Sequence, residues 1–95
     1  MLAVTKEIRG FVIDNFLFGQ DRDSFSNEDS FLDNGLIDSM GILMLVEFVK
    51  ERFSVSIDDE EIVPDNFDSV LRVATFVQNK MEAGQSRSFQ TAGTR

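Results

Sequence analysis

Residues 39–53, with the sequence SMGILMLVEFVKERF, carry the strongest helical pattern in the chain. At about 100° of rotation per residue, one stripe of this segment is apolar. That stripe holds Ile42, Leu45, Val46, Val49 and Phe53, and the opposite side holds Met40, Met44, Glu47 and Glu51. Asp38 or Ser39 is suited to cap the start, because a short side-chain oxygen accepts from the free N–H groups of a first turn. The pattern predicts a capped amphipathic helix over residues 39–53.

Two further amphipathic helices are predicted, one on each side of this segment. The first spans about residues 2–18 and has Val4, Ile8, Phe11, Val12 and Phe16 at helical spacing. The last runs to about residue 81 with Val70, Val73, Ala74, Val77 and Met81 facing inward. The expected boundaries are Gly19 at the end of the first helix, Asp68 or Ser69 as the cap of the last, and Gly84 as its end.

The remaining segments predict one small all-α domain. Residues 20–37 keep no helical period and read as a long loop between the first and second helices. A short helical turn is expected over residues 59–63 and should end at Pro64. The fold class is therefore all-α, a bundle of three main helices plus one short helix. We expect a single domain over residues 1–83 and a disordered tail over residues 84–95.

The composition narrows the possible functions. The chain has 95 residues, 17 acidic against 9 basic, and neither Cys nor His. Without Cys or His there is no thiolate nucleophile, no disulfide and no imidazole base or zinc ligand. The acidic excess repels phosphate backbones and anionic lipid and attracts proteins with basic patches. Since no apolar run approaches a membrane span and the start does not read as a signal peptide, we expect a cytoplasmic monomer that binds no nucleic acid and does not insert into membranes.

One serine stands where chemistry is feasible. Ser39 is placed at the start of the best helix, where free N–H donors and the helix dipole favour an attached phosphate. Gly35 allows the backbone to turn into that helix, and Leu36 and Ile37 are expected to anchor the preceding loop. The simpler alternative is that Asp38 and Ser39 only cap the helix.

The segment Gly35-Leu36-Ile37-Asp38-Ser39-Met40-Gly41, followed by LMLVEFVKERF, resembles the attachment motif and second helix of acyl carrier proteins. The similarity extends over about residues 2–81, including the long loop, the acidic turn at 58–61 and the segment 62–69. The resemblance implies an acyl-carrier-type bundle with no catalytic activity of its own, used in fatty acid or secondary-metabolite biosynthesis. Ser39 would carry 4′-phosphopantetheine, transferred from coenzyme A by a phosphopantetheinyl transferase. Asp38 would help that transferase recognise the motif or cap the helix.

The resemblance also implies partners and a mode of action. The arm ends in a thiol that holds an acyl group as a thioester. An acyl- or aminoacyl-adenylating ligase would load it, and a downstream acyltransferase or synthase would accept the cargo. Carriers of fatty-acid synthesis usually have acidic residues two and five positions after the serine, where this chain has Gly41 and Met44. The chain is in this respect more similar to free-standing carriers with dedicated ligases, including D-alanyl carrier proteins. We expect the partner surface to include Met40, Met44, Glu47 and Ile62.

Several alternatives stay open at this point. The carrier could take aminoacyl or peptidyl cargo from an adenylating ligase, or the bundle could be an unmodified protein-interaction module. An enzyme ranks third, because Ser39 has no His partner. The run Asp21-Arg22-Asp23 opens like a calcium loop but lacks the later glycine and glutamate. The acidic turn at 58–61 is either a solvated helix start or a partner contact. Six apolar residues either line a gap for cargo or pack solid: Phe53, Ile62, Val63, Val70, Ala74 and Val77.

Overall fold

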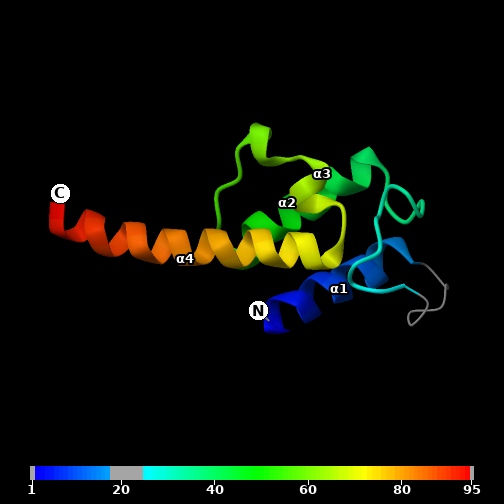
Figure 1. Cartoon of the computed structure of the whole chain (residues 1–95), viewed down its shortest axis with the longest axis horizontal. Helices are drawn as coiled ribbons and strands as arrows, with labels where there is room; N and C mark the ends of the chain where they lie inside the picture. Colours follow the sequence, from blue (N-terminus) through cyan, green and yellow to red (C-terminus); the bar gives the residue numbers. More distant parts are fainter. Residues whose placement is uncertain (1, 18–24, 95) are drawn as a thin grey trace.

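Four α-helices and one 3-10 turn build the protein in the computed structural model, which describes residues 2–17 and 25–94, with side chains up to residue 83. In chain order the elements are α1 (Leu2–Phe16), α2 (Ser39–Phe53), the 3-10 turn η2 (Asp59–Glu61), α3 (Pro64–Phe67) and α4 (Val70–Thr94). No strand occurs within these described ranges. Helix α4 lies along α1 and α2, and α3 sits at the end of α4 where that helix begins (Figure 1). The predicted all-α bundle is confirmed.

Helix α2 forms at the predicted residues. Asp38 is its N-cap, and its Oδ1 accepts a hydrogen bond from the Gly41 N–H at 2.8 Å. This bond satisfies one of the first-turn N–H groups that a helix cannot pair internally. The helix ends at Ser54, which adopts a left-handed conformation with φ of 54°. Of the two predicted caps, Asp38 therefore makes the capping hydrogen bond, and the Ser39 side chain takes no part in it.

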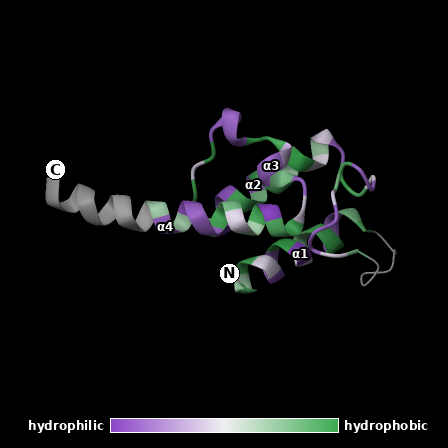
Figure 2. Cartoon of the chain, viewed as in Figure 1, coloured by the Kyte–Doolittle hydropathy of each residue, from purple (hydrophilic) through white to green (hydrophobic). Residues whose placement is uncertain are grey.

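The core lies where α1, α2 and α4 meet. Each helix buries the apolar stripe that its spacing predicts, and Figure 2 shows hydrophobic colour along these facing sides. The fully buried hydrophobic residues of these three helices are Ile8 and Val12 of α1, Leu45 and Val49 of α2, and Val70, Val73, Ala74 and Val77 of α4, and Phe67 of α3 is buried with them. The predicted inward residues Phe11, Phe16, Ile42, Phe53 and Met81 are half-buried and pack against this core. Phe31 of the long loop is also fully buried, so the loop contributes to the same core.

The structure corrects two predicted boundaries. Pro64 begins helix α3 instead of ending a helical turn, because the fixed φ and missing N–H of proline suit the first position of a helix. The expected turn over residues 59–63 is the shorter η2. The prediction that Gly84 ends the last helix is wrong, since α4 continues to Thr94. A glycine inside a helix costs only about 1 kcal/mol, and no proline follows it to stop the helix.

Other expectations fall outside the described part of the chain. The predicted stop at Gly19 and the weak calcium motif at residues 21–23 belong to the undescribed range 18–24. The expected disorder of residues 84–95 concerns residues whose side chains are not described. Among the described helices, none combines the length and apolar character needed to cross a membrane.

Candidate functional site

The loop before α2 places Ser39 at the surface. Gly35 adopts a φ of 67°, a left-handed conformation that residues other than glycine rarely adopt. The following residues return to the core, where the Leu36 N–H donates to the Phe31 carbonyl at 2.9 Å and Ile37 is buried. Ser39 then begins α2 with its side chain exposed. The predicted turn at Gly35 and the predicted anchor at Ile37 are both confirmed.

Gly41 allows the start of α2 to pack closely against α1. A Cβ at this position would lie 2.5 Å from Ile37 Cγ2 and 2.9 Å from Phe16 Cε1. Carbon atoms pack best at about 3.5–4.0 Å, so the site has no room for a side chain. The sequence placed Gly41 in the motif around Ser39, at a position where carriers of fatty-acid synthesis usually have an acidic residue. The structure gives the reason for the glycine, which is the approach of Phe16 and Ile37.

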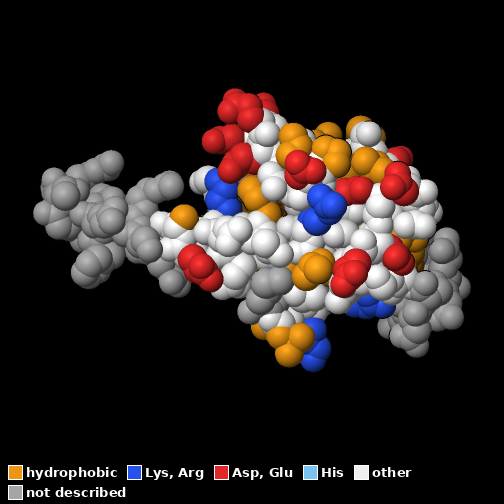
Figure 3. Space-filling model, viewed as in Figure 1, with side chains coloured by type: hydrophobic (Ala, Val, Ile, Leu, Met, Phe, Trp, Pro, Cys, Tyr) orange, Lys and Arg blue, Asp and Glu red, His pale blue; other side chains and the backbone are white. Residues whose placement is uncertain are grey.

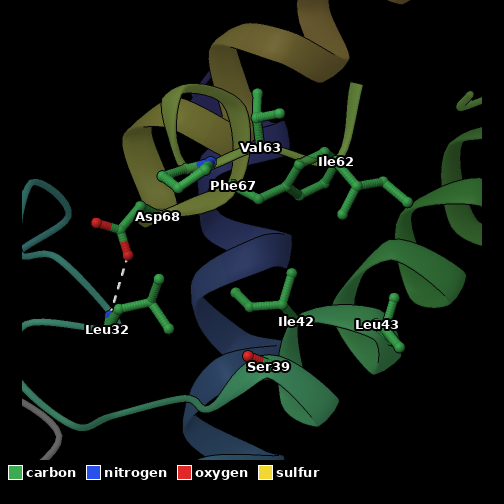
Figure 4. Close-up of a pocket in the computed structure, with 9 residues that line it drawn as sticks. Leu32, Ser39, Ile42, Leu43, Ile62, Val63, Phe67 and Asp68 are labelled. Carbon is green, nitrogen blue, oxygen red and sulfur yellow. Dashed lines mark hydrogen bonds between the residues drawn. The ribbon is translucent and has the colours of Figure 1, made fainter. Parts of the chain in front are cut away.

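An apolar cleft opens beside Ser39. It has a volume of about 320 Å³ and lies between the first turns of α2 and the segment that contains α3. Ile42 and Leu43 line it from α2, and Ile62, Val63 and Phe67 line it from the segment on the other side (Figure 4). Ser39, Leu32, Pro64 and Asp68 complete the lining. The Ser39 hydroxyl therefore stands at an edge of a cleft whose surface is mostly hydrocarbon.

The cleft includes only part of the gap expected from the sequence. Ile62 and Val63 line it, as predicted for residues of a cargo site. Phe53 does not, and Val70, Ala74 and Val77 are fully buried in the core instead. The lining residues that sequence analysis missed include Leu32, Leu43 and Asp68. An isolated apolar residue in a polar loop was the available signal for Leu32, and the local pattern marked Asp68 as a candidate helix cap without indicating a place in the cleft.

The predicted partner residues separate into two places. Met40 and Met44 are exposed by 70% and 51%, and Glu47 is exposed on the same outer side of α2. These three residues do not line the cleft; Met44 and Glu47 instead border a shallow groove between α1 and α2 together with Phe11 and Phe48. Ile62 alone of the four lies in the cleft with Ser39. The sequence therefore predicted correctly that the methionines face solvent rather than the core.

An acidic turn stands next to the cleft. Acidic side chains gather over η2, at the upper edge of the molecule in Figure 3. Glu61 pairs with Lys80 of α4 at 2.8 Å and also accepts from the Asp58 N–H at 2.9 Å. The hydrogen bond from Lys80, with that backbone N–H in support, lowers the pKa of Glu61 below its ordinary value. The contact fastens η2, and with it the neighbouring Ile62, to α4.

The fold and this site define a small all-helical bundle with an exposed serine at a helix N-terminus beside an apolar cleft. Compared with known proteins, the chain matches no family model and no curated protein. The assignment of a function therefore rests on the residues of the site.

Proposed function

We propose that this protein is an acyl carrier protein that takes 4′-phosphopantetheine on Ser39 and presents an acyl group to partner enzymes. The observation that carries the proposal is the position of Ser39, which is exposed in the first turn of α2 at the edge of the apolar cleft. When bound, the arm supplies a thiol that holds an acyl group as a thioester. The chain has no Cys of its own, so this chemistry needs such a group.

The residues around Ser39 fit a phosphate ester. The hydroxyl makes no hydrogen bond to any residue that the structure describes, and it is open to a modifying enzyme. Asp38 binds the Gly41 N–H, while the N–H groups of Ser39 and Met40 precede the first intrahelical hydrogen bond. Those groups and the positive end of the helix dipole stabilise a phosphate at this position. The chain has no His, and the neighbouring Asp38 carboxylate is engaged with the Gly41 N–H, so a separate phosphopantetheinyl transferase would supply the chemistry.

The cleft fits an apolar acyl group better than a charged aminoacyl group. Its walls are the hydrocarbon side chains of Ile42, Leu43, Ile62, Val63 and Phe67. Burying hydrocarbon there is favourable, whereas an ammonium group would lose its hydration and meet one carboxylate, Asp68, whose two oxygens already accept from Ser30 and Leu32. An aminoacyl or peptidyl carrier loaded by an adenylating ligase would use the same serine, and it remains the alternative within this class.

The outer side of α2 is the surface we propose for the loading ligase and for the downstream acyltransferase or synthase. Met40 and Met44 expose flexible apolar side chains next to Glu47. Methionines adapt their shape to different partners, and an acidic residue beside them complements a basic patch. Ile62 is close enough to the cleft to contact the arm or a partner.

The first test is modification of Ser39. The full chain is incubated with coenzyme A and a broad-specificity phosphopantetheinyl transferase, and its intact mass is measured. We expect a gain of one phosphopantetheine group in the wild type and none in Ser39→Ala, which keeps the Asp38 cap. A known carrier in the same reaction shows that the transferase is active.

A wild-type chain that gains no mass while the known carrier is modified would refute the proposal. An unmodified interaction module would then be the better description of the bundle. Cargo is tested next, by adding ATP, a candidate ligase and competing fatty and amino acids. Selective loading of an amino acid would replace the acyl carrier by the aminoacyl alternative.

A further inference from the structure

A single residue at the junction of α3 and α4 holds three consecutive loop residues. Asp68 accepts from the Ser30 hydroxyl at 2.5 Å through Oδ2 and from the Leu32 N–H at 3.0 Å through Oδ1. Its backbone carbonyl accepts from the Phe31 N–H at 2.7 Å. Two of these bonds are made to a carboxylate, which strengthens them relative to bonds between neutral groups. Residues 30–32 are therefore fixed to the α3–α4 junction.

The same loop residues are tied to the segment that leads to Ser39. The Phe31 carbonyl accepts from the N–H groups of Leu36 and Ile37, which directly precede Asp38 and Ser39. The Phe31 side chain is fully buried, so this connection is anchored in the core. Asp68 is thus linked through Phe31 to the start of α2.

These bonds join the two walls of the cleft at its Ser39 end. Helix α2 packs on α1 and α4, whereas α3 packs on α4. Between the walls, Leu32 and Asp68 both line the cleft, and the bond from the Leu32 N–H to Asp68 closes that side (Figure 4). Leu32 is 44% exposed, and its carbonyl also accepts from the Gly35 N–H at 3.2 Å, so the bond to Asp68 is the one that ties it to the opposite wall.

We propose that Asp68 is a positioning residue that, through Ser30 and Phe31, sets the width of the cleft and keeps Leu32 as its wall next to Ser39. The proposal rests on the proposed function in one respect, because the group that the cleft would shelter is the cargo attached at Ser39. A fixed wall shields an acyl chain in the cleft from water, and a released wall exposes it. Asp68 takes no part in any reaction; it acts on the cleft through the loop.

The first experiment uses the unloaded full chain and does not depend on the modification of Ser39. Amide hydrogen exchange is measured by NMR in Ser30→Ala and Asp68→Ala. In Asp68→Ala, which removes the acceptor of the Leu32 N–H, we expect the Leu32 amide to exchange roughly tenfold faster or more than in the wild type. In Ser30→Ala we expect a smaller acceleration, because this change removes the bond that orients the Asp68 carboxylate, together with the bond from the Asp33 N–H to Ser30 Oγ at 3.0 Å, and leaves the acceptor of Leu32 in place. Ser30→Thr keeps the hydroxyl and should restore slow exchange.

Asp29→Ala is the matched control. It removes a bond of the same kind in the same loop, from the Ser26 N–H to Asp29 Oδ2 at 2.8 Å, without touching Asp68. We expect it to leave exchange at Leu32 within about twofold of the wild type, because surface changes away from a buried network have small effects. Equal acceleration at Leu32 in Asp29→Ala and Ser30→Ala would overturn the proposal, since it would mean general loosening of the loop.

The second experiment measures shelter of cargo. The phosphopantetheinyl transferase loads each chain at Ser39 with the acyl-phosphopantetheine group of hexanoyl-coenzyme A or acetyl-coenzyme A. Cleavage of the thioester by hydroxylamine is then followed by intact mass. We expect the hexanoyl chain to be released several-fold faster from Ser30→Ala than from the wild type or Ser30→Thr, with acetyl release unchanged. Wild-type rates of hexanoyl release in both Ser30→Ala and Asp68→Ala would overturn the proposal. If no chain gains mass, the proposed function fails, and the exchange experiment still decides the role of Asp68.

Discussion

Replacement of Gly41 by alanine tests the closest contact at the site. The new Cβ would lie 2.5 Å from Ile37 Cγ2 and 2.9 Å from Phe16 Cε1, about 1 Å inside a normal carbon–carbon distance. Ile37 is buried and its Cγ2 methyl is on the branched Cβ, so it cannot swing away freely. Overpacking of this kind destabilises a protein by about 1–3 kcal/mol.

Gly10 of α1 provides the matched control. Nothing lies within 4 Å of a Cβ built there, so Gly10→Ala brings only the helix preference of alanine, about 0.5–1 kcal/mol of stabilisation. Gly41→Ala gains at most the same amount. The difference between the two variants therefore isolates the overpacking, and we expect Gly41→Ala to be the less stable by about 1–3 kcal/mol.

Urea unfolding followed by far-UV circular dichroism measures this difference. For a domain of this size, with a slope near 1 kcal/mol per molar urea, the two midpoints should differ by about 1 M or more. The slopes must agree for the comparison to hold, because a changed slope indicates a changed denatured state. A Gly41→Ala chain as stable as Gly10→Ala would refute the close approach of Phe16 and Ile37 to Gly41.

Two further predictions concern the N-cap of α2 and the ion pair between Glu61 and Lys80. Asp38→Ala should lower the free energy of unfolding by about 1 kcal/mol, because it removes the cap of α2. Ser39→Ala should change the same free energy by less than about 0.5 kcal/mol. Equal effects of the two changes in urea unfolding would contradict the assignment of the cap to Asp38. Lys80→Met should remove less than about 1 kcal/mol at neutral pH. Because the folded pKa of Glu61 is lowered from 4.5, the pair stabilises above that value and its contribution is lost as the pH falls through the folded pKa. Thermal unfolding from neutral to acidic pH should therefore show wild type and Lys80→Met converging. A constant gap would contradict this, as would the same convergence in Lys6→Met, since Lys6 makes no ion pair with a residue that the structure describes.

The helices were predictable to the extent that local spacing decides them. Residues three and four apart share a helix face, so the core and solvent sides of α2 followed from residues 39–53 alone. The exposure of Met40 and Met44 followed from the same rule. Boundaries were less certain, because Pro64 and Gly84 are each compatible with a helix as well as with its end.

The sequence by itself determined the helical bundle, the capped start of α2 and the outward position of Ser39, because these depend on neighbours within a few residues. Only the tertiary structure decided the cleft, the reason for Gly41 and the role of Asp68. Ser30 and Asp68 are 38 positions apart, and Gly41 meets Phe16 across two helices. Such contacts depend on how the helices pack, which no local pattern of residues specifies.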